Sequence, residues 1–252
     1  MATRSDIFDY ALRLGDDALV LSHRLSEWSA HAPEFEEDVA LSNLALDLLG
    51  QARSLLTYAG QVEGKGRGED ELAYWRDDRQ FRNLLLVEQP NGDFAMTIVR
   101  HLLFATYQLA IYQALEDSAD ATFAGVAAKG AKEARYHRDH AALWTVRLGD
   151  GTEESHRRMD RALLALWPLT AEMFQVDAIT LRLADDGIIP AAESVRPGWD
   201  AFVEATLREA TLEVPQGVAA RVGGRAGLHS EYLGHLLAEM QHLHRSHPDA
   251  SW

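Results

Sequence analysis

The sequence of 252 residues contains no cysteine. The chain therefore forms no disulfide or thiolate metal site, and it offers no cysteine nucleophile. It also lacks a Gly-x-Ser-x-Gly motif and any serine with an evident histidine and aspartate partner, so nucleophilic catalysis has no support. The missing cysteines fit a reducing compartment, and we expect a cytoplasmic protein.

Basic residues are also few: the sequence contains 24 lysines and arginines but 39 aspartates and glutamates. Its formal net charge is −15. A protein without a net positive field does not attract phosphates, so we expect no nucleic-acid partner. No apolar run of about 18 residues is free of polar residues, and the N-terminus lacks the basic-then-apolar pattern of a signal peptide. We therefore expect no membrane association.

Strand-like runs are rare, whereas leucine and alanine recur at helical spacing, so the sequence predicts an all-α fold. We expect one domain over residues 1–252, with a helical bundle over about 5–148 and a C-terminal helical extension over about 152–246. Helices are predicted over about 5–30, 34–60, 94–115, 130–148, 155–167, 199–213 and 229–245, with a break through Pro190 and Pro197. The helix over 94–115 is apolar nearly all round, so it is either central to its own domain or pressed against a partner.

One stripe of the helix predicted over 130–148 consists of Ala134, His137, Ala141, Trp144 and Leu148. A histidine there is either a hydrogen-bonded core residue or half of a metal-binding pair. In four-helix carboxylate-bridged metal proteins, two helices each supply Glu-x-x-His and two others each supply a glutamate. Here Ala134 replaces the glutamate before His137, Leu48 and Gln51 occupy the matching positions of the second helix, and residues 94–115 contain no acid. We therefore expect a core histidine and no metal or other cofactor in this chain.

Two literal Glu-x-x-His strings occur elsewhere. Glu153 to His156 begins a helix beside arginines and is interpreted as a solvated first turn. In the last helix, one face holds Glu231, His235, Glu239 and His242, and the face expected to pack holds Leu228, Tyr232, Leu236, Leu237, Met240 and Leu243. A surface divalent-metal site is the alternative there, but a solvated polar face is the favoured interpretation.

Two basic helix faces are present, consisting of Lys129, Lys132, Arg135 and Arg138 and of Arg157, Arg158 and Arg161. Each is suited to an acidic partner or a phosphorylated ligand, and an ordinary solvated face is slightly favoured.

Five strings together resemble the family of non-catalytic, structural subunits of bacterial phenylacetyl-CoA ring 1,2-epoxidases: YALRLGDDALVLSHRLSEW (10–28), LDLLGQARSLLTYA (46–59), RDDRQFRNLLLVEQPNGDFA (76–95), KEARYH (132–137) and GGRAGLHSEYLGHLLAEMQ (223–241). The resemblance spans essentially the whole chain. It implies a ferritin-like helical bundle within a multicomponent monooxygenase of aerobic phenylacetate degradation. Its implied partner is a related catalytic subunit with a di-iron centre, and a reductase and small accessory components take part indirectly.

No catalytic residue is transferred by this resemblance, because the positions that correspond to the two Glu-x-x-His motifs are Leu48, Gln51, Ala134 and His137. The chain is then expected to be a hetero-oligomer with its catalytic partner, a homo-oligomer when alone, and to have no active site of its own. The resemblance also favours assembly as the way in which residues 94–115 are buried. The alternative function is an independent metal-dependent oxygenase with an unrecognised site, and the acid-free helix over 94–115 argues against it.

Overall fold

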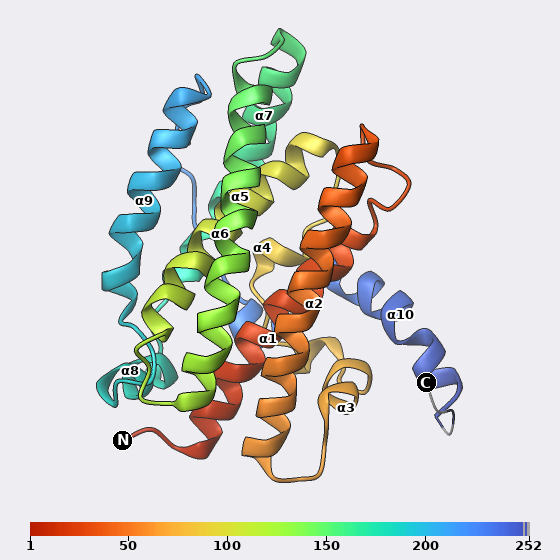
Figure 1. The fold of residues 1–252 in the computed structure, drawn as a ribbon, viewed down its shortest axis with the longest axis vertical. Helices are drawn as coiled ribbons and strands as arrows, with labels where there is room; N and C mark the ends of the chain where they lie inside the picture. The colour runs from red at the N-terminus through yellow and green to blue at the C-terminus, as the bar shows by residue number, and fades with distance from the viewer. Residues whose placement is uncertain (249, 251–252) are drawn as a thin grey trace. The chain divides into compact units, whose positions relative to one another are not determined.

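The computed structural model describes residues 1–248 and 250, and in this part every regular element is a helix (Figure 1). The expected all-α class is confirmed. Within the described residues, ten α-helices are joined by loops and short 3-10 segments: α1 (Arg4–Ser26), α2 (Phe35–Glu63), α3 (Glu69–Tyr74), α4 (Leu85–Glu88), α5 (Phe94–Leu115), α6 (Ala121–Gly149), α7 (Glu153–Leu166), α8 (Ala178–Asp185), α9 (Ala192–Glu209) and α10 (Glu231–Ser246).

The chain forms two compact units. The α1/α2 unit comprises residues 2–90 and 223–252, and the α5/α6 unit comprises Met1 and residues 91–222. The expected bundle over 5–148 and the expected extension over 152–246 therefore each contribute residues to both units. Whether the two units act as one ferritin-like domain stays a prediction.

A long helical hairpin forms the centre of the α1/α2 unit (Figure 1). The side chain of Thr3 accepts a hydrogen bond from the backbone N–H of Asp6, and the carboxylate of Asp6 accepts one from the backbone N–H of Thr3, so a capping box starts α1. The left-handed Gly64, with φ of 72°, ends α2. The segment with α3 and α4 contacts these helices, and α10 packs against α3 and α1.

The second hairpin consists of α5 and α6, with α7 and α9 also packed against α5. Helix α5 has the predicted bounds, because Asp93 caps its first turn by accepting a hydrogen bond from the N–H of Met96. By length and composition α5 is apolar enough to cross a membrane, but 83% of its most apolar window is buried. The chain itself therefore buries α5, and the expectation that assembly with a partner buries this helix is wrong.

Helix α6 begins at Ala121, nine residues before the predicted start, and Gly130 lies in its interior. A Cβ atom at Gly130 would lie 2.5 Å from Cε2 of Tyr112 on α5, so glycine permits the close approach of the two helices. The buried stripe continues from Ala141 to Thr145, while Trp144 and Leu148 are only partly buried. The prediction that these two side chains belong to the core stripe is therefore only partly correct.

Two further sequence predictions are wrong in this unit. The region treated as broken contains α8, which starts where Asp177 caps the N–H groups of Ile179 and Thr180. Helix α9 starts at Ala192 and includes Pro197. Pro197 is the sixth residue of this helix and lies beyond its first turn, so the carbonyl of Glu193 has no N–H at position 197 to accept from.

Candidate functional site

The four positions that correspond to the metal-binding motifs are all buried in the middle of long helices. Leu48 and Gln51 are buried on α2, and Ala134 and His137 are buried on α6, with relative exposures of 0%, 3%, 0% and 0%. The predicted phases of both helices at these positions are thus confirmed. Gln51 and His137 belong to different units, so each is described with its own unit.

Within the α5/α6 unit, His137 lies beside a second buried imidazole that sequence inspection missed. The ring centroids of His101 on α5 and His137 on α6 are 5.5 Å apart. Neither ring nitrogen of His101 has a hydrogen-bond partner among the described residues. Burial, and then the positive potential of His137, hold the pKa of His101 well below its usual range. His101 is therefore neutral at physiological pH.

The donor set at these positions does not fit a carboxylate-bridged di-iron centre. The side chains of Leu48 and Ala134 are hydrocarbons and donate no ligand, and α5 supplies no carboxylate anywhere between Phe94 and Leu115. Among residues 1–248 and 250, no three histidine, aspartate or glutamate side chains gather as metal ligands would. The expectation that the chain binds no metal stays a prediction, because only a metal analysis tests it.

Two carboxylates in the middle of α1 have a different role, and sequence inspection missed it. Asp16, which is fully buried, forms an ion pair with Arg76, whose Nη1 lies 2.9 Å from Oδ2 of Asp16. Asp17 accepts hydrogen bonds from Nη2 of Arg225 at 2.7 Å and from the N–H of Leu84 at 2.7 Å. Burial raises the pKa of Asp17 to about 6, although Arg225 acts in the opposite direction.

A third buried pair joins α4 to the loop before α10. Nδ1 of His229 lies 2.7 Å from Oε2 of Glu88, and both side chains are at most 2% exposed. The N–H of Ser230 and Nδ2 of Asn83 also donate to this carboxylate, at 2.6 and 2.9 Å. Arg24 of α1 donates to the backbone carbonyl of Glu88 at 2.8 Å. These contacts join the segment before residue 91 to the segment after residue 222 within the α1/α2 unit.

Replacing His229 with glutamine is expected to destabilise the protein more at pH 6 than at pH 9. Burial would lower the pKa of His229, but the hydrogen bond and charge of Glu88 outweigh it and raise this pKa above its usual value. A group with a raised folded-state pKa stabilises fully below its unfolded pKa, and the effect is lost as pH rises through the folded pKa. Hydrogen bonds to charged groups contribute about 1.5–3 kcal/mol, which bounds the expected difference.

Chemical denaturation of the wild type and of His229→Gln at several pH values measures this difference. Replacement of the solvent-exposed His235 by glutamine serves as the control for a histidine outside the buried cluster. A His229→Gln effect that grows with pH would show that the histidine is neutral when paired with Glu88.

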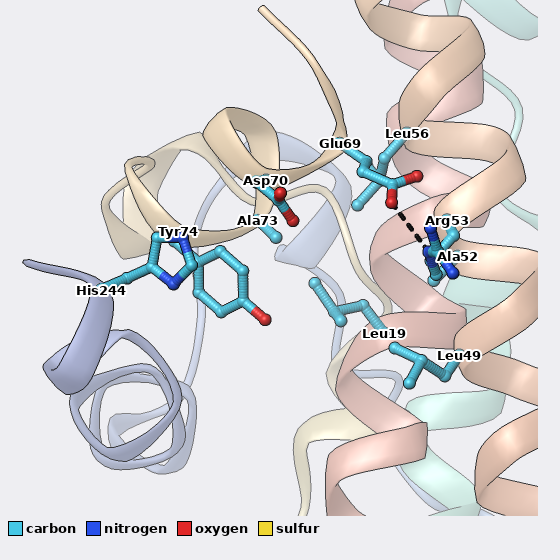
Figure 2. A pocket seen from close by; sticks show the side chains of 10 residues that line it. All are labelled: Leu19, Leu49, Ala52, Arg53, Leu56, Glu69, Asp70, Ala73, Tyr74 and His244. Carbon is cyan, nitrogen blue, oxygen red and sulfur yellow. Dashed lines mark hydrogen bonds and ion pairs between the residues drawn. The ribbon is translucent and has the colours of Figure 1, made fainter. Parts of the chain in front are cut away.

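The α1/α2 unit also contains a pocket of about 320 Å³ (Figure 2). Its apolar lining comprises Leu19, Leu49, Ala52, Leu56 and Ala73, and its polar lining comprises Arg53, Glu69, Asp70, Tyr74 and His244. The rings of Tyr74 and His244 are stacked 4.1 Å apart on the side opposite the leucines. The leucines and alanines give the pocket an apolar wall, which is suited to packing an apolar group.

The face of α10 that was expected to pack is only partly correct. Leu236 and Leu237 are buried together with Leu233 and Gln241, whereas Leu228, Tyr232 and Leu243 are exposed. Gln241 is buried because its amide donates hydrogen bonds to the carbonyls of Ala73 and Arg76 at 3.0 and 2.9 Å. The face of α10 that packs therefore includes this polar residue and differs from the apolar face predicted from the sequence. Glu231, His235, Glu239 and His242 are solvent-exposed as predicted.

The two predicted basic faces are partly neutralised by their own neighbours. Arg138 pairs with Asp139 at 2.7 Å and lies over the ring of Phe202. Arg158 pairs with Glu154 at 2.7 Å, and Arg161 lies 3.5 Å from Asp93. These contacts favour ordinary solvated helix faces over a phosphate-binding site.

Among the described residues, these observations define an all-α protein with hydrocarbon side chains at Leu48 and Ala134. The chain belongs to the family of phenylacetic acid catabolic proteins, whose family model matches residues 1–252. It is 51% identical over 243 residues to a subunit of the 1,2-phenylacetyl-CoA epoxidase of Escherichia coli (strain K12), and the match covers 96% of this chain and 98% of that protein.

Proposed function

We propose that this chain is the non-catalytic structural subunit of a phenylacetyl-CoA ring 1,2-epoxidase in aerobic phenylacetate catabolism. Its similarity to an epoxidase subunit along nearly its full length supports membership of such a complex. The partners proposed are the catalytic di-iron subunit and, indirectly, a reductase and small accessory components. The proposal includes a ferritin-like bundle in the cytoplasm, and the two long hairpins α1–α2 and α5–α6 are consistent with it.

The observation that carries the non-catalytic role is the pair of hydrocarbon side chains at Leu48 and Ala134. Both side chains are fully buried in a closely packed interior. An acidic side chain nearby therefore cannot rotate into either position. The acid-free α5 removes a further carboxylate. In this role the chain contributes a rigid surface that binds and stabilises its partner, and the oxygen chemistry takes place in the partner.

The experiment compares this chain alone, the catalytic subunit alone and the two together, each with the reductase and phenylacetyl-CoA. We expect no stoichiometric iron in this chain, and ring epoxidation that neither subunit achieves alone. About two iron atoms per chain, lost in His137→Ala, would establish the independent oxygenase instead. Undiminished epoxidation and stability of the catalytic subunit without this chain would refute the structural role.

A further inference from the structure

Helix α2 is apolar on two opposite faces. One face is buried and holds Leu41, Leu44, Leu48 and Leu55. The opposite face holds Phe35, Val39 and Leu46, which are 79%, 46% and 64% exposed. At 3.6 residues per turn these three side chains lie within about 40° of one another around the helix axis, so they form one stripe.

The stripe leads into the pocket of the same unit. Leu49 and Arg53 follow Leu46 at helical spacing along the stripe, and both line the pocket of about 320 Å³. Figure 2 shows Leu49 and Leu19 facing this space from the hairpin, with Tyr74 across from them. A ridge of exposed apolar side chains beside a pocket is the arrangement that protein interfaces use for a buried anchor residue.

Acidic residues outnumber basic residues around the stripe. Residues 25–52 contain no lysine or arginine and six acids, namely Glu27, Glu34, Glu36, Glu37, Asp38 and Asp47. At the pocket end, Arg53 is paired with Glu69 at 2.7 Å, and Asp70 adds a further carboxylate to the lining. The negative charge that borders the apolar surface therefore lies in the first turn of α2, at Asp47 and in the pocket at Asp70.

We propose that the α2 surface, consisting of Phe35, Val39, Leu46, Leu49 and the adjoining pocket, is the docking face for a different protein chain. That chain presents an apolar surface bordered by lysine or arginine and inserts one apolar side chain into the pocket. The inference rests on the proposed function, in which this partner is the catalytic subunit.

A second copy of this chain fits the surface poorly. A two-fold contact through α2 places the same patch on both sides, and this patch offers the acids of the other copy no lysine or arginine from residues 25–52 and only Arg53, which pairs with Glu69. Like charges across an interface oppose association, whereas basic residues on a different partner would attract and orient it. The same negative border repels anionic lipid surfaces and nucleic acids.

The first test measures the affinity of full-length variants for the intact catalytic subunit. Leu46→Ser is compared with Leu164→Ser on α7, because both leucines are exposed, at 64% and 59%. We expect Leu46→Ser to weaken binding about tenfold or more and Leu164→Ser to leave it unchanged. Equal affinities of the wild type and both variants, or a loss with Leu164→Ser only, would overturn the assignment of the surface.

The second test changes only the charge beside the stripe. Asn43 is exposed between Val39 and Leu46, and lysine and glutamate have similar helix propensities, so Asn43→Lys and Asn43→Glu differ mainly in charge. We expect Asn43→Lys to bind several-fold more weakly than Asn43→Glu at low salt, and the difference to shrink at high salt. Tighter binding by Asn43→Lys than by Asn43→Glu at low salt would overturn the proposal that lysine or arginine borders the partner's apolar surface.

The two hypotheses fail in distinguishable ways. A wild-type chain that does not bind the catalytic subunit would refute the proposed function. A wild-type chain that binds it, with unchanged affinity in Leu46→Ser, would refute only the docking face. If Leu46→Ser abolishes self-association of the isolated chain but not binding to the catalytic subunit, the α2 surface is a contact between copies.

Discussion

Replacing Arg76 with alanine is expected to lower the free energy of unfolding by about 3–5 kcal/mol. Asp16 is fully buried, and the guanidinium of Arg76 is its ion-pair partner. The N–H of Arg82 also donates to Asp16 at 2.8 Å, but it carries no compensating charge. The truncated variant therefore leaves a buried carboxylate without a cation, and denaturant titration measures the loss.

The matched control is Arg53→Ala, which removes an arginine from a solvent-exposed pair with Glu69. Surface pairs of this kind contribute about 0–1 kcal/mol, so this variant should stay close to the wild type. A double variant, Asp16→Leu with Arg76→Met, should recover much of the stability lost in Arg76→Ala, because it leaves no buried charge behind. Equal losses in Arg76→Ala and Arg53→Ala would contradict the role of the buried pair.

The sequence predicted those elements whose signals are local. Helix α5 has the predicted bounds because its apolar run is flanked by a turn and by a capping Asp93. The start of α6 was misjudged because glycine usually marks a break, whereas Gly130 is needed where Tyr112 packs against the helix. The residue that requires glycine at position 130 is Tyr112 on α5, so the sequence of α6 alone does not show this requirement.

The buried ion pairs were missed for a similar reason. Asp16 and Arg76 are 60 residues apart, Asp17 and Arg225 are 208 apart, and Glu88 and His229 are 141 apart. Spacing rules act within one helix and do not pair residues at such distances. The only local sign was an Asp-Asp pair in an otherwise apolar stretch of α1, since charged residues are seldom buried without a partner.

The positions of the missing metal ligands could be predicted from the sequence, because they depend on helix periodicity alone. Leu48, Gln51, Ala134 and His137 all face a buried interior, as their spacing predicted. Periodicity could not single out His101 in the same way, since helix α5 is apolar on all sides and offers no stripe against which a polar residue stands out.

The Ala134→Glu variant is expected to lose about 4 kcal/mol or more of stability. Ala134 is fully buried on α6, one turn from the position where Gly130 contacts Tyr112. A glutamate there adds a methylene and a carboxylate group beyond Cβ to a closely packed interior and places an ionisable group away from water. The measurement is chemical denaturation at neutral pH. The adjacent Arg135→Glu variant is the control, and its exposed site should keep the change within about 0.5 kcal/mol.

The same substitution tests whether core residues have replaced the metal ligands or whether the interior still holds a metal site. Combining Ala134→Glu with Leu48→Glu and Gln51→His creates two literal Glu-x-x-His motifs, one of which ends at His137. We expect this triple variant to bind no stoichiometric iron and to epoxidise nothing on its own, because α5 still supplies no carboxylate. Iron analysis and product assays measure both outcomes. A triple variant as stable as the wild type, with iron bound at His137, would show that the interior still accommodates a metal centre and that the core interpretation of these positions is wrong.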